Sequence, residues 1–217
     1  MRIFCILYGI LYSILAFSHD AELLNKAFTH HLYAGPLVGY GSTTWNGLVP
    51  STKNQNLALS ISTPILVKEG GGVWGFFAGY EFSPYFALEG SYTRYPKASI
   101  FFDEESLFAF ENDGRLDLRT DTETGSVMAK VMLFIPRTTV RAYSSVGVAQ
   151  VHRWDDINEN NRIAPTFGIG LNYNFAEHLM AELGANYTAG YGESELNPAK
   201  DYVPFLFSVF FKLAYRV

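Results

Sequence analysis

Large apolar side chains alternate with small or polar ones along most of this chain, in segments of roughly ten residues. A period of two is typical of β-strands with one apolar face, and strands of this length cross a bilayer when they are tilted. Eight such segments are predicted, at 31–43, 72–82, 85–95, 122–135, 139–151, 163–175, 179–189 and 204–217. The pattern therefore predicts an all-β chain of eight antiparallel strands.

The connections between these segments alternate between short and long. Tight turns are predicted at Ser83-Pro84, Pro136-Arg137-Thr138 and Ala176-Glu177-His178, and long loops near 46–70, 96–120, 152–162 and 190–203. Bacterial outer-membrane barrels have this asymmetry, with short turns in the periplasm and long loops outside the cell. An even number of strands then places both ends of the barrel on the periplasmic side.

The two faces of each predicted strand differ in the size of their side chains. In the last segment, one face carries the large residues Val209, Phe211, Leu213, Tyr215 and Val217. The opposite face carries Ser208, Lys212, Ala214 and Arg216. Large groups outside and small groups inside suit a narrow up-and-down transmembrane barrel whose lumen is filled by side chains. The alternative is a soluble barrel whose apolar face lines a ligand cavity. The many aromatic residues on the apolar face favour the membrane barrel.

The N-terminus has the character of a secretory signal peptide. Met1 and Arg2 precede an apolar run to Phe17, which is shorter than the roughly 20 residues of a spanning helix. A membrane anchor is the alternative. Cys5 is the only cysteine, so the mature chain would have no disulfide and no thiolate nucleophile. The predicted organisation is a signal peptide at 1–18, a short periplasmic segment at 19–30 and an outer-membrane β-barrel at 31–217.

Five charged residues fall on the inward face of the predicted strands. They are expected to form one layer of the lumen, with Glu89 beside Lys130 and Glu182 beside Lys212; the layer comprises Glu89, Lys130, Arg141, Glu182 and Lys212. Charges buried in a narrow barrel must pair, because an unpaired one costs several kcal/mol. A structural role is therefore expected for the layer, and a gate or a proton path is the alternative.

One hairpin pattern occurs twice, and it resembles a known family. Gly79–Tyr92 resembles the second hairpin of the OmpA-like and opacity-type outer-membrane barrels, and Tyr173–Glu182 resembles their sixth and seventh strands. The resemblance covers nearly the whole mature chain and implies an eight-stranded barrel in the cell outer membrane. It implies no ligand. The peptidoglycan-binding domain of full-length OmpA is expected to be absent, because the chain ends with the barrel.

The last strand also resembles the signal that the barrel assembly machinery reads in this family. That signal has outward apolar or aromatic residues at alternate positions, here Phe211, Leu213, Tyr215 and Val217. Families with this signal usually end in Phe, whereas this chain ends in Val217. The resemblance implies that the assembly machinery inserts the barrel into the membrane.

No catalytic, cofactor or metal site is predicted. The chain has no His-x-Ser motif of the kind that lipid A deacylases carry, and Ser144-Ser145 has no placed base. His30-His31 at a strand start would point to opposite faces and make a poor chelate, and the acidic run Asp103–Glu105 has no EF-hand spacing. The net charge of −5 gives no basic footprint for nucleic acid.

The second long loop carries four phenylalanines beside its acidic run, namely Phe101, Phe102, Phe108 and Phe110. Apolar groups in an exposed loop need a partner, so these pack on other loops, extend the strands or contact a host or surface molecule. Outer-membrane lipid and lipopolysaccharide are the other expected partners. The predicted function is a structural or surface-interaction barrel; the alternatives are a lipid A-modifying enzyme and a narrow ion or solute channel.

Overall fold

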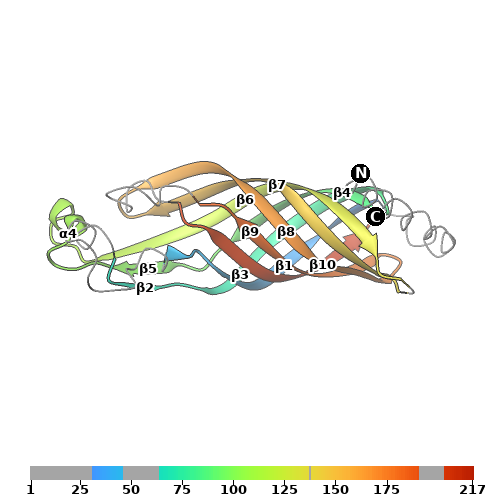
Figure 1. The fold of residues 1–217 in the computed structure, drawn as a ribbon, viewed down its shortest axis with the longest axis horizontal. Helices are drawn as coiled ribbons and strands as arrows, with labels where there is room; N and C mark the ends of the chain where they lie inside the picture. The colour runs from blue at the N-terminus through green and yellow to red at the C-terminus, as the bar shows by residue number, and fades with distance from the viewer. Residues whose placement is uncertain (1–30, 46–63, 137, 191–202) are drawn as a thin grey trace, which may run out of the picture.

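The computed structural model describes residues 31–45, 64–136, 138–190 and 203–217, which are mostly strand (Figure 1). The predicted signal peptide and the segment 19–30 lie outside the described residues. No helix in the described part of the chain is long and apolar enough to cross a membrane. The elements are β1 (Leu32–Ser42), β2 (Leu66–Lys68), β3 (Gly71–Ser83), β4 (Phe86–Arg94), β5 (Ala98–Phe101), α4 (Leu107–Glu111), β6 (Asp117–Phe134), β7 (Val140–Asp155), β8 (Glu159–Ala176), β9 (Leu179–Thr188) and β10 (Leu206–Arg216).

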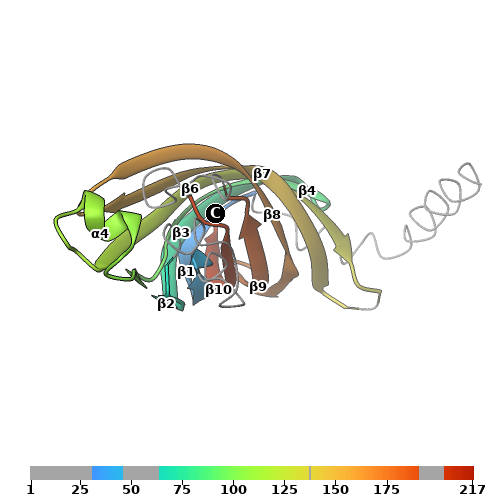
Figure 2. The same ribbon diagram turned by 60° about the vertical axis from the view of Figure 1, so that its left-hand side comes forward.

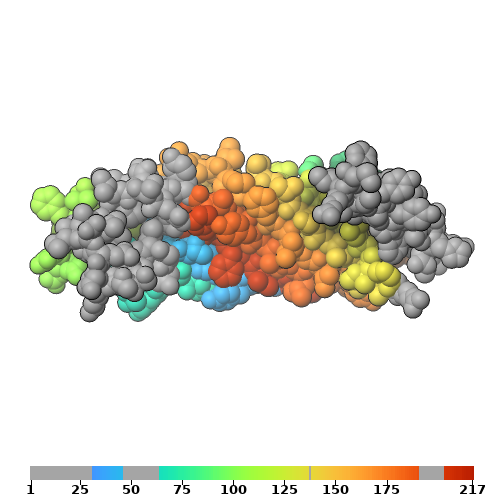
Figure 3. Space-filling model, in the orientation of Figure 1, coloured from blue at the N-terminus to red at the C-terminus, as the bar shows by residue number. Residues whose placement is uncertain are grey.

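Eight of the strands close into an antiparallel barrel. Their order around the wall is β1, β3, β4, β6, β7, β8, β9 and β10, and β10 pairs back onto β1. Figure 2 shows the strands curving around a common axis, and Figure 3 shows the red last strand lying against the blue first strand. Closure leaves no unpaired edge within the wall, as a lipid environment requires. The predicted eight-stranded barrel is therefore confirmed.

The predicted inside and outside faces are also confirmed. In β10 buried and exposed residues alternate strictly from Leu206 to Arg216. Outward aromatic residues such as Trp74, Phe76 and Phe211 are about half exposed, whereas Phe77 and Phe210 point inward and are buried. An apolar outer wall that is exposed, around an interior that holds charged as well as apolar side chains, matches a lipid-facing surface.

The short connections from β3 to β4, from β6 to β7 and from β8 to β9 lie at one end of the barrel. The start of β1 and the end of β10 lie at the same end. The backbone N–H of Val217 donates to the carbonyl oxygen of Leu32 at 2.8 Å, so the barrel begins and ends side by side. Arg216 N–H donates to the carbonyl oxygen of His178, which lies in the turn between β8 and β9. By the rule for bacterial barrels this is the periplasmic end.

The predicted long loop at 152–162 is wrong. Strand β7 continues to Asp155 and strand β8 begins at Glu159, so a short turn joins them. The Asp155 carboxylate closes this turn by accepting from the backbone N–H groups of Ile157 and Asn158, at 2.9 and 2.7 Å. The polar composition of the segment suggested a loop, but strands outside the membrane have water on their outer face and need no apolar side chains there.

The predicted loop at 96–120 is likewise more ordered than expected. Strand β5 pairs with the extracellular part of β6, and β2 pairs with β5. Helix α4 caps the far end of the molecule in Figure 1, and the Ser106 hydroxyl accepts from Ala109 N–H at its start. We call this part of the molecule, residues 64–70 and 96–120, the extracellular extension. Most of the predicted loops at 46–70 and 190–203 lies outside the described residues.

Candidate functional site

Four charged side chains meet in the middle of the lumen, and we call them the lumen quartet: Glu89, Lys130, Glu182 and Lys212. Lys130 Nζ lies 2.6 Å from Glu89 and 2.8 Å from Glu182. Lys212 Nζ lies 2.6 Å from Glu89 and 2.9 Å from Glu182. Each lysine therefore bridges both carboxylates, which adds two cross-pairs to the neighbours expected from the sequence. All four side chains are buried, with 1 to 3% of each residue exposed.

Two tyrosines complete the hydrogen bonding of the quartet. Tyr33 Oη donates to Glu89 at 3.1 Å, and Tyr143 Oη donates to Glu182 at 2.9 Å. The Tyr33 ring lies over Gly79, its register partner on the neighbouring strand β3. A Cβ atom at position 79 would collide with this ring. The small inward residues of the strands thus make room for the large side chains that reach the centre of the lumen. These tyrosine contacts were not predicted from the sequence, because they depend on the register between distant strands.

A second charged layer lies toward the periplasmic end, and it corrects the prediction of a single layer. Arg141 is not in the quartet: its guanidinium donates to Glu81 at 2.7 Å. Arg216 donates to the same carboxylate at 2.6 Å. Asn172 accepts from Arg141 at 2.8 Å, and Asn174 accepts from Arg216 at 2.9 Å. We call Glu81, Arg141 and Arg216 the periplasmic triad.

The sequence prediction missed the periplasmic triad because it counted positions from each turn without the tilt of the strands. Glu81 lies on β3 and Arg216 on the last strand, 135 residues apart in the sequence. Strand β1 lies between β3 and β10, and its pairings with both bring the two residues together at the end of the barrel. Only the closure of the barrel reveals that contact, so patterning within single strands could not have found it.

A third charged layer, of one ion pair, lies at the extracellular end of the described lumen. Arg153 and Asp155 are paired through a short contact, and neither side chain is exposed. The Arg153 guanidinium also lies over the ring of Trp45, 4.7 Å from its centroid. The lumen therefore contains buried ion pairs at three levels. Each charge has a partner of opposite sign, which offsets the cost of removing it from water.

The extracellular extension has an apolar core of its own. The Phe102 and Phe108 rings stack with centroids 4.1 Å apart, and they pack in a cluster with other buried residues. The cluster consists of Trp45, Ala98, Ile100, Phe102, Phe108 and Leu118. These two phenylalanines are thus unavailable as contacts for a partner. Phe110 is 86% exposed on α4, and Phe101 lies half-buried beneath Lys68, whose Nζ is 5.5 Å from its ring centroid.

The assembly-signal residues all face outward from β10 and its end. Phe211, Leu213, Tyr215 and Val217 are between 41 and 67% exposed. Tyr215 stacks on the His178 ring of the preceding turn, with the ring centroids 5.5 Å apart. The placement matches the expected geometry of the signal, and its recognition by the assembly machinery stays a prediction.

A network of hydrogen bonds surrounds His152 on the outer face of the extracellular part of the barrel wall. Its Nδ1 lies 3.1 Å from Glu123 and its Nε2 lies 2.9 Å from Glu159, while Tyr92 Oη donates to Glu123 at 2.6 Å. The hydrogen bond with Glu123 raises the pKa of His152. The hydrogen bond from Tyr92 lowers the pKa of Glu123. Ser144 lies on the same strand as His152. A strand rises by roughly 3.3 Å per residue, so the two residues are about 26 Å apart. They cannot act together as nucleophile and base.

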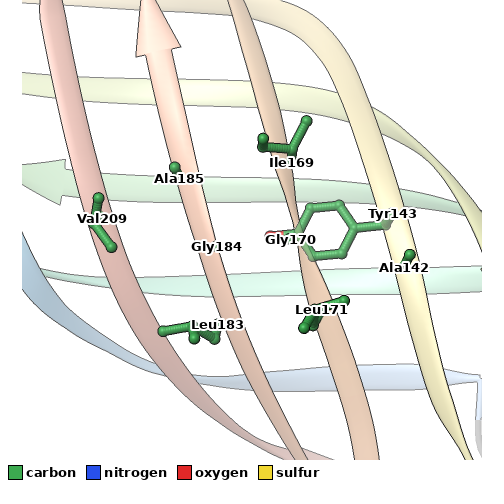
Figure 4. A pocket seen from close by; sticks show the side chains of 9 residues that line it. All are labelled: Ala142, Tyr143, Ile169, Gly170, Leu171, Leu183, Gly184, Ala185 and Val209. Atoms are coloured by element: carbon green, nitrogen blue, oxygen red, sulfur yellow. The ribbon is translucent and has the colours of Figure 1, made fainter.

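A shallow apolar hollow of about 450 Å³ lies on the outer wall where β7, β8, β9 and β10 pass (Figure 4). Gly170 and Gly184 pair directly across β8 and β9 at its floor. Outward Ile169, Leu171 and Leu183 stand around them. The hollow is lined by apolar groups and faces the same way as the lipid-facing wall, so it offers packing space without polar chemistry.

Comparison with known proteins agrees with this architecture. A model of the outer membrane protein beta-barrel domain family matches residues 10–203. No curated protein matches the sequence. Among solved structures, the outer membrane protein OprG from Pseudomonas aeruginosa is similar with a TM-score of 0.52 and 10% identity, over 87% of this chain and 96% of that one. The N-terminal barrel domain of Pseudomonas aeruginosa OprF gives a TM-score of 0.48 and 14% identity, over 87% and 98%.

The match and the structure agree on location as well as on fold. The family model covers most of the described strands, and the similarity to OprG supports the fold. The lipid-facing wall, the closed sheet and the short turns at one end are what the outer membrane of a Gram-negative bacterium requires. This chain is located in the outer membrane and belongs to the outer membrane protein β-barrel domain family.

Proposed function

We propose that this protein is a structural and surface-interaction barrel, which anchors an ordered extension outside the membrane. The observation that carries the proposal is the contrast between a lumen whose centre is occupied by buried ion pairs and an extension built only around an apolar core of its own. A lumen of eight strands has little room beyond its side chains. The lumen quartet occupies the centre of that room, where a conducting path would have to pass.

The far end of the extension supports a role in contact. Phe110 on α4 is the most exposed of the large apolar residues in the described chain, and it does not share in the core beside it. A single exposed aromatic residue next to a rigid core is suited to insert into a partner's surface, because aromatic anchors carry much of the binding energy at interfaces. Glu104, Glu105 and Glu111 lie within six residues of it in the sequence, and negative charge in this segment favours a basic partner.

The alternatives have less support. A lipid A-modifying enzyme needs a nucleophile and a base within hydrogen-bond reach, and Ser144 and His152 are too far apart. A narrow channel needs charges that exchange partners, whereas each lysine of the quartet already contacts both carboxylates. The dense pairing favours a fixed lumen over a gate.

The experiment measures attachment of bacteria that display the protein to a cultured epithelial monolayer, with a strain that lacks the protein as the baseline. Phe110→Ser is expected to lower attachment to the baseline. Ile163→Ser, on the outer wall and 79% exposed, is the matched control and is expected to attach like the wild type. Attachment that is equal for Phe110→Ser and the wild type would reject the proposed contact, and a steady conductance of the wild-type barrel in planar bilayers would reject the closed lumen.

A further inference from the structure

The outer face of the extracellular extension and of the adjoining end of β4 carries a group of cations at and just beyond the aromatic girdle. We call these the basic wall patch: Lys68, Arg94, Lys97 and Arg119. Arg94 pairs across β3 and β4 with Trp74, whose ring contacts that of Tyr92 with a centroid distance of 6.3 Å. Outward Trp and Tyr residues mark the height of the membrane interface. The lowest cation of the patch therefore lies at the level of the lipid headgroups.

Strand register sets Lys68 and Arg119 above Arg94 on the same face, and Lys97 lies just before β5 and contacts Asp121. Lys68 pairs with Ser99, and Ser99 pairs with Arg119, so these three residues form one row across β2, β5 and β6. The opposite face of this small sheet is buried in the apolar core, including Ala98 and Ile100. The row must therefore face outward. The side chains of Lys97 and Arg119 are 69 and 74% exposed.

The patch has more positive than negative charge. Asp121 is shared between Arg94 at 3.3 Å and Lys97 at 3.0 Å. Asp117 lies 3.6 Å from Arg119, longer than a normal hydrogen bond. Glu123 lies opposite Arg94 in the β4–β6 register, so four cations face three carboxylates, on a chain whose net charge is −5. A local positive excess on an acidic protein indicates an anionic partner at that position.

The height and the side of the membrane identify the partner. The patch lies at the end opposite the short turns and the barrel termini, which is the outside of the cell. The anionic groups at that level of the outer leaflet are the phosphates of lipopolysaccharide. Arg guanidinium groups bind phosphate in two-point geometry and Lys ammonium groups bind it as point charges, and this patch contains both. We propose that the basic wall patch binds the lipid A phosphates of lipopolysaccharide, with Lys97 and Arg119 as the principal contacts.

This inference goes beyond the proposed surface contact, because it concerns the lipid-facing wall and not the end of the extension. It also has a readout that is independent of cell attachment. Purified barrel is placed in phosphatidylcholine nanodiscs that contain bisphosphorylated lipid A, and the lipid A retained per protein is measured by native mass spectrometry. Matching discs contain dephosphorylated lipid A or phosphatidylglycerol.

The test variant is Lys97→Gln with Arg119→Gln. The matched control, Arg115→Gln with Arg162→Gln, removes the same charge from the same end of the molecule. Each cation near an anionic surface contributes about 1 kcal/mol, so the test variant is expected to bind bisphosphorylated lipid A roughly tenfold or more weakly. The control is expected to bind like the wild type. Heat-modifiable electrophoretic mobility verifies that each variant is folded. If the double variant fails to fold, Lys97→Gln alone replaces it, and this variant is expected to bind roughly fivefold more weakly.

Three results would overturn the proposal. Equal loss of binding in the test and control variants would show a general charge effect without a patch. Wild-type binding that is equally strong for dephosphorylated lipid A would show that the phosphates are not recognised. An equal dependence on Lys97 and Arg119 in phosphatidylglycerol discs would show binding of any anionic lipid, and not of lipid A.

Discussion

The barrel lumen and the extracellular extension fill their interiors in different ways. The lumen holds buried, paired charges among apolar side chains: Glu182 and Lys212 are each 1% exposed, and the Lys212 ammonium lies over the buried ring of Phe210. The extension is filled by apolar groups, with Phe102 stacked on Phe108. The difference follows from which face of the sheet meets lipid. Inside the membrane the apolar side chains must face outward, so polar groups are left for the interior; outside it the apolar side chains can turn inward again.

The largest expected effect is in the lumen quartet. Glu182→Gln leaves Lys130 and Lys212 with Glu89 as their remaining carboxylate, so the variant holds an uncompensated buried charge. Removing one partner of a buried ion pair costs about 3–5 kcal/mol. Urea unfolding in lipid vesicles should show a loss of this size. Glu104→Gln in the exposed loop is the control, and it should stay within about 0.5 kcal/mol of the wild type.

A somewhat smaller loss is expected in the periplasmic triad. Glu81→Gln removes the carboxylate that Arg141 and Arg216 share, but each arginine keeps its asparagine partner. The remaining hydrogen bonds should limit the loss to about 2–3 kcal/mol in the same unfolding assay. If Glu81→Gln unfolds more easily than Glu182→Gln, the ranking of the two layers is incorrect.

The two phenylalanines of α4 test whether the extension is a separate packing unit. Phe108→Ala removes a buried ring and should abolish the hydrogen-exchange protection of β5, while the unfolding midpoint of the barrel changes little. Phe110→Ala is the matched control, because the same substitution at an exposed site leaves both measurements unchanged. A large shift of the barrel midpoint in Phe108→Ala would mean that the lumen and the extension unfold together.

The smallest expected effect is a pH dependence of the β7–β8 hairpin. Because folding raises the pKa of His152, its contribution is complete below the ordinary pKa of about 6.5 and is lost as the pH rises through the raised value. Glu123, whose pKa is lowered, stays ionised throughout this range. Hydrogen-exchange protection factors at Val151 and Arg162 should therefore fall between pH 6 and pH 8, roughly the range around that value. In His152→Gln they should be independent of pH.

The sequence predicted the barrel well because alternation is a local property. The inward and outward faces of β3 and β10 follow directly from residues such as Trp74 and Phe211, and no distant contact is needed to assign them. The part of the molecule outside the membrane was predicted less well, because polar residues such as Asp155 and Asn158 are typical of loops and also occur at the ends of strands that lie in water. Their pairing depends on the partner strand, which the local pattern does not contain.

The charged lumen was predicted in part for a related reason. The inward position of each charge follows from alternation, but its height depends on the tilt and stagger of neighbouring strands. Counting from the turns placed Arg141 with the quartet, whereas strand tilt places it beside Glu81. The tyrosine partners of the quartet were also not predicted, since a side chain that crosses the lumen contacts a strand far away in the sequence.

The central claim is that the lumen quartet is a fixed structural element and not a gate. The most direct test is Lys212→Glu, measured in one preparation for heat-modifiable mobility and for conductance in planar bilayers. Because three carboxylates then surround Lys130, we expect this variant to lose its resistance to heat and to form no stable channel. A barrel that keeps the heat resistance of the wild type and gains a steady conductance would contradict the central claim.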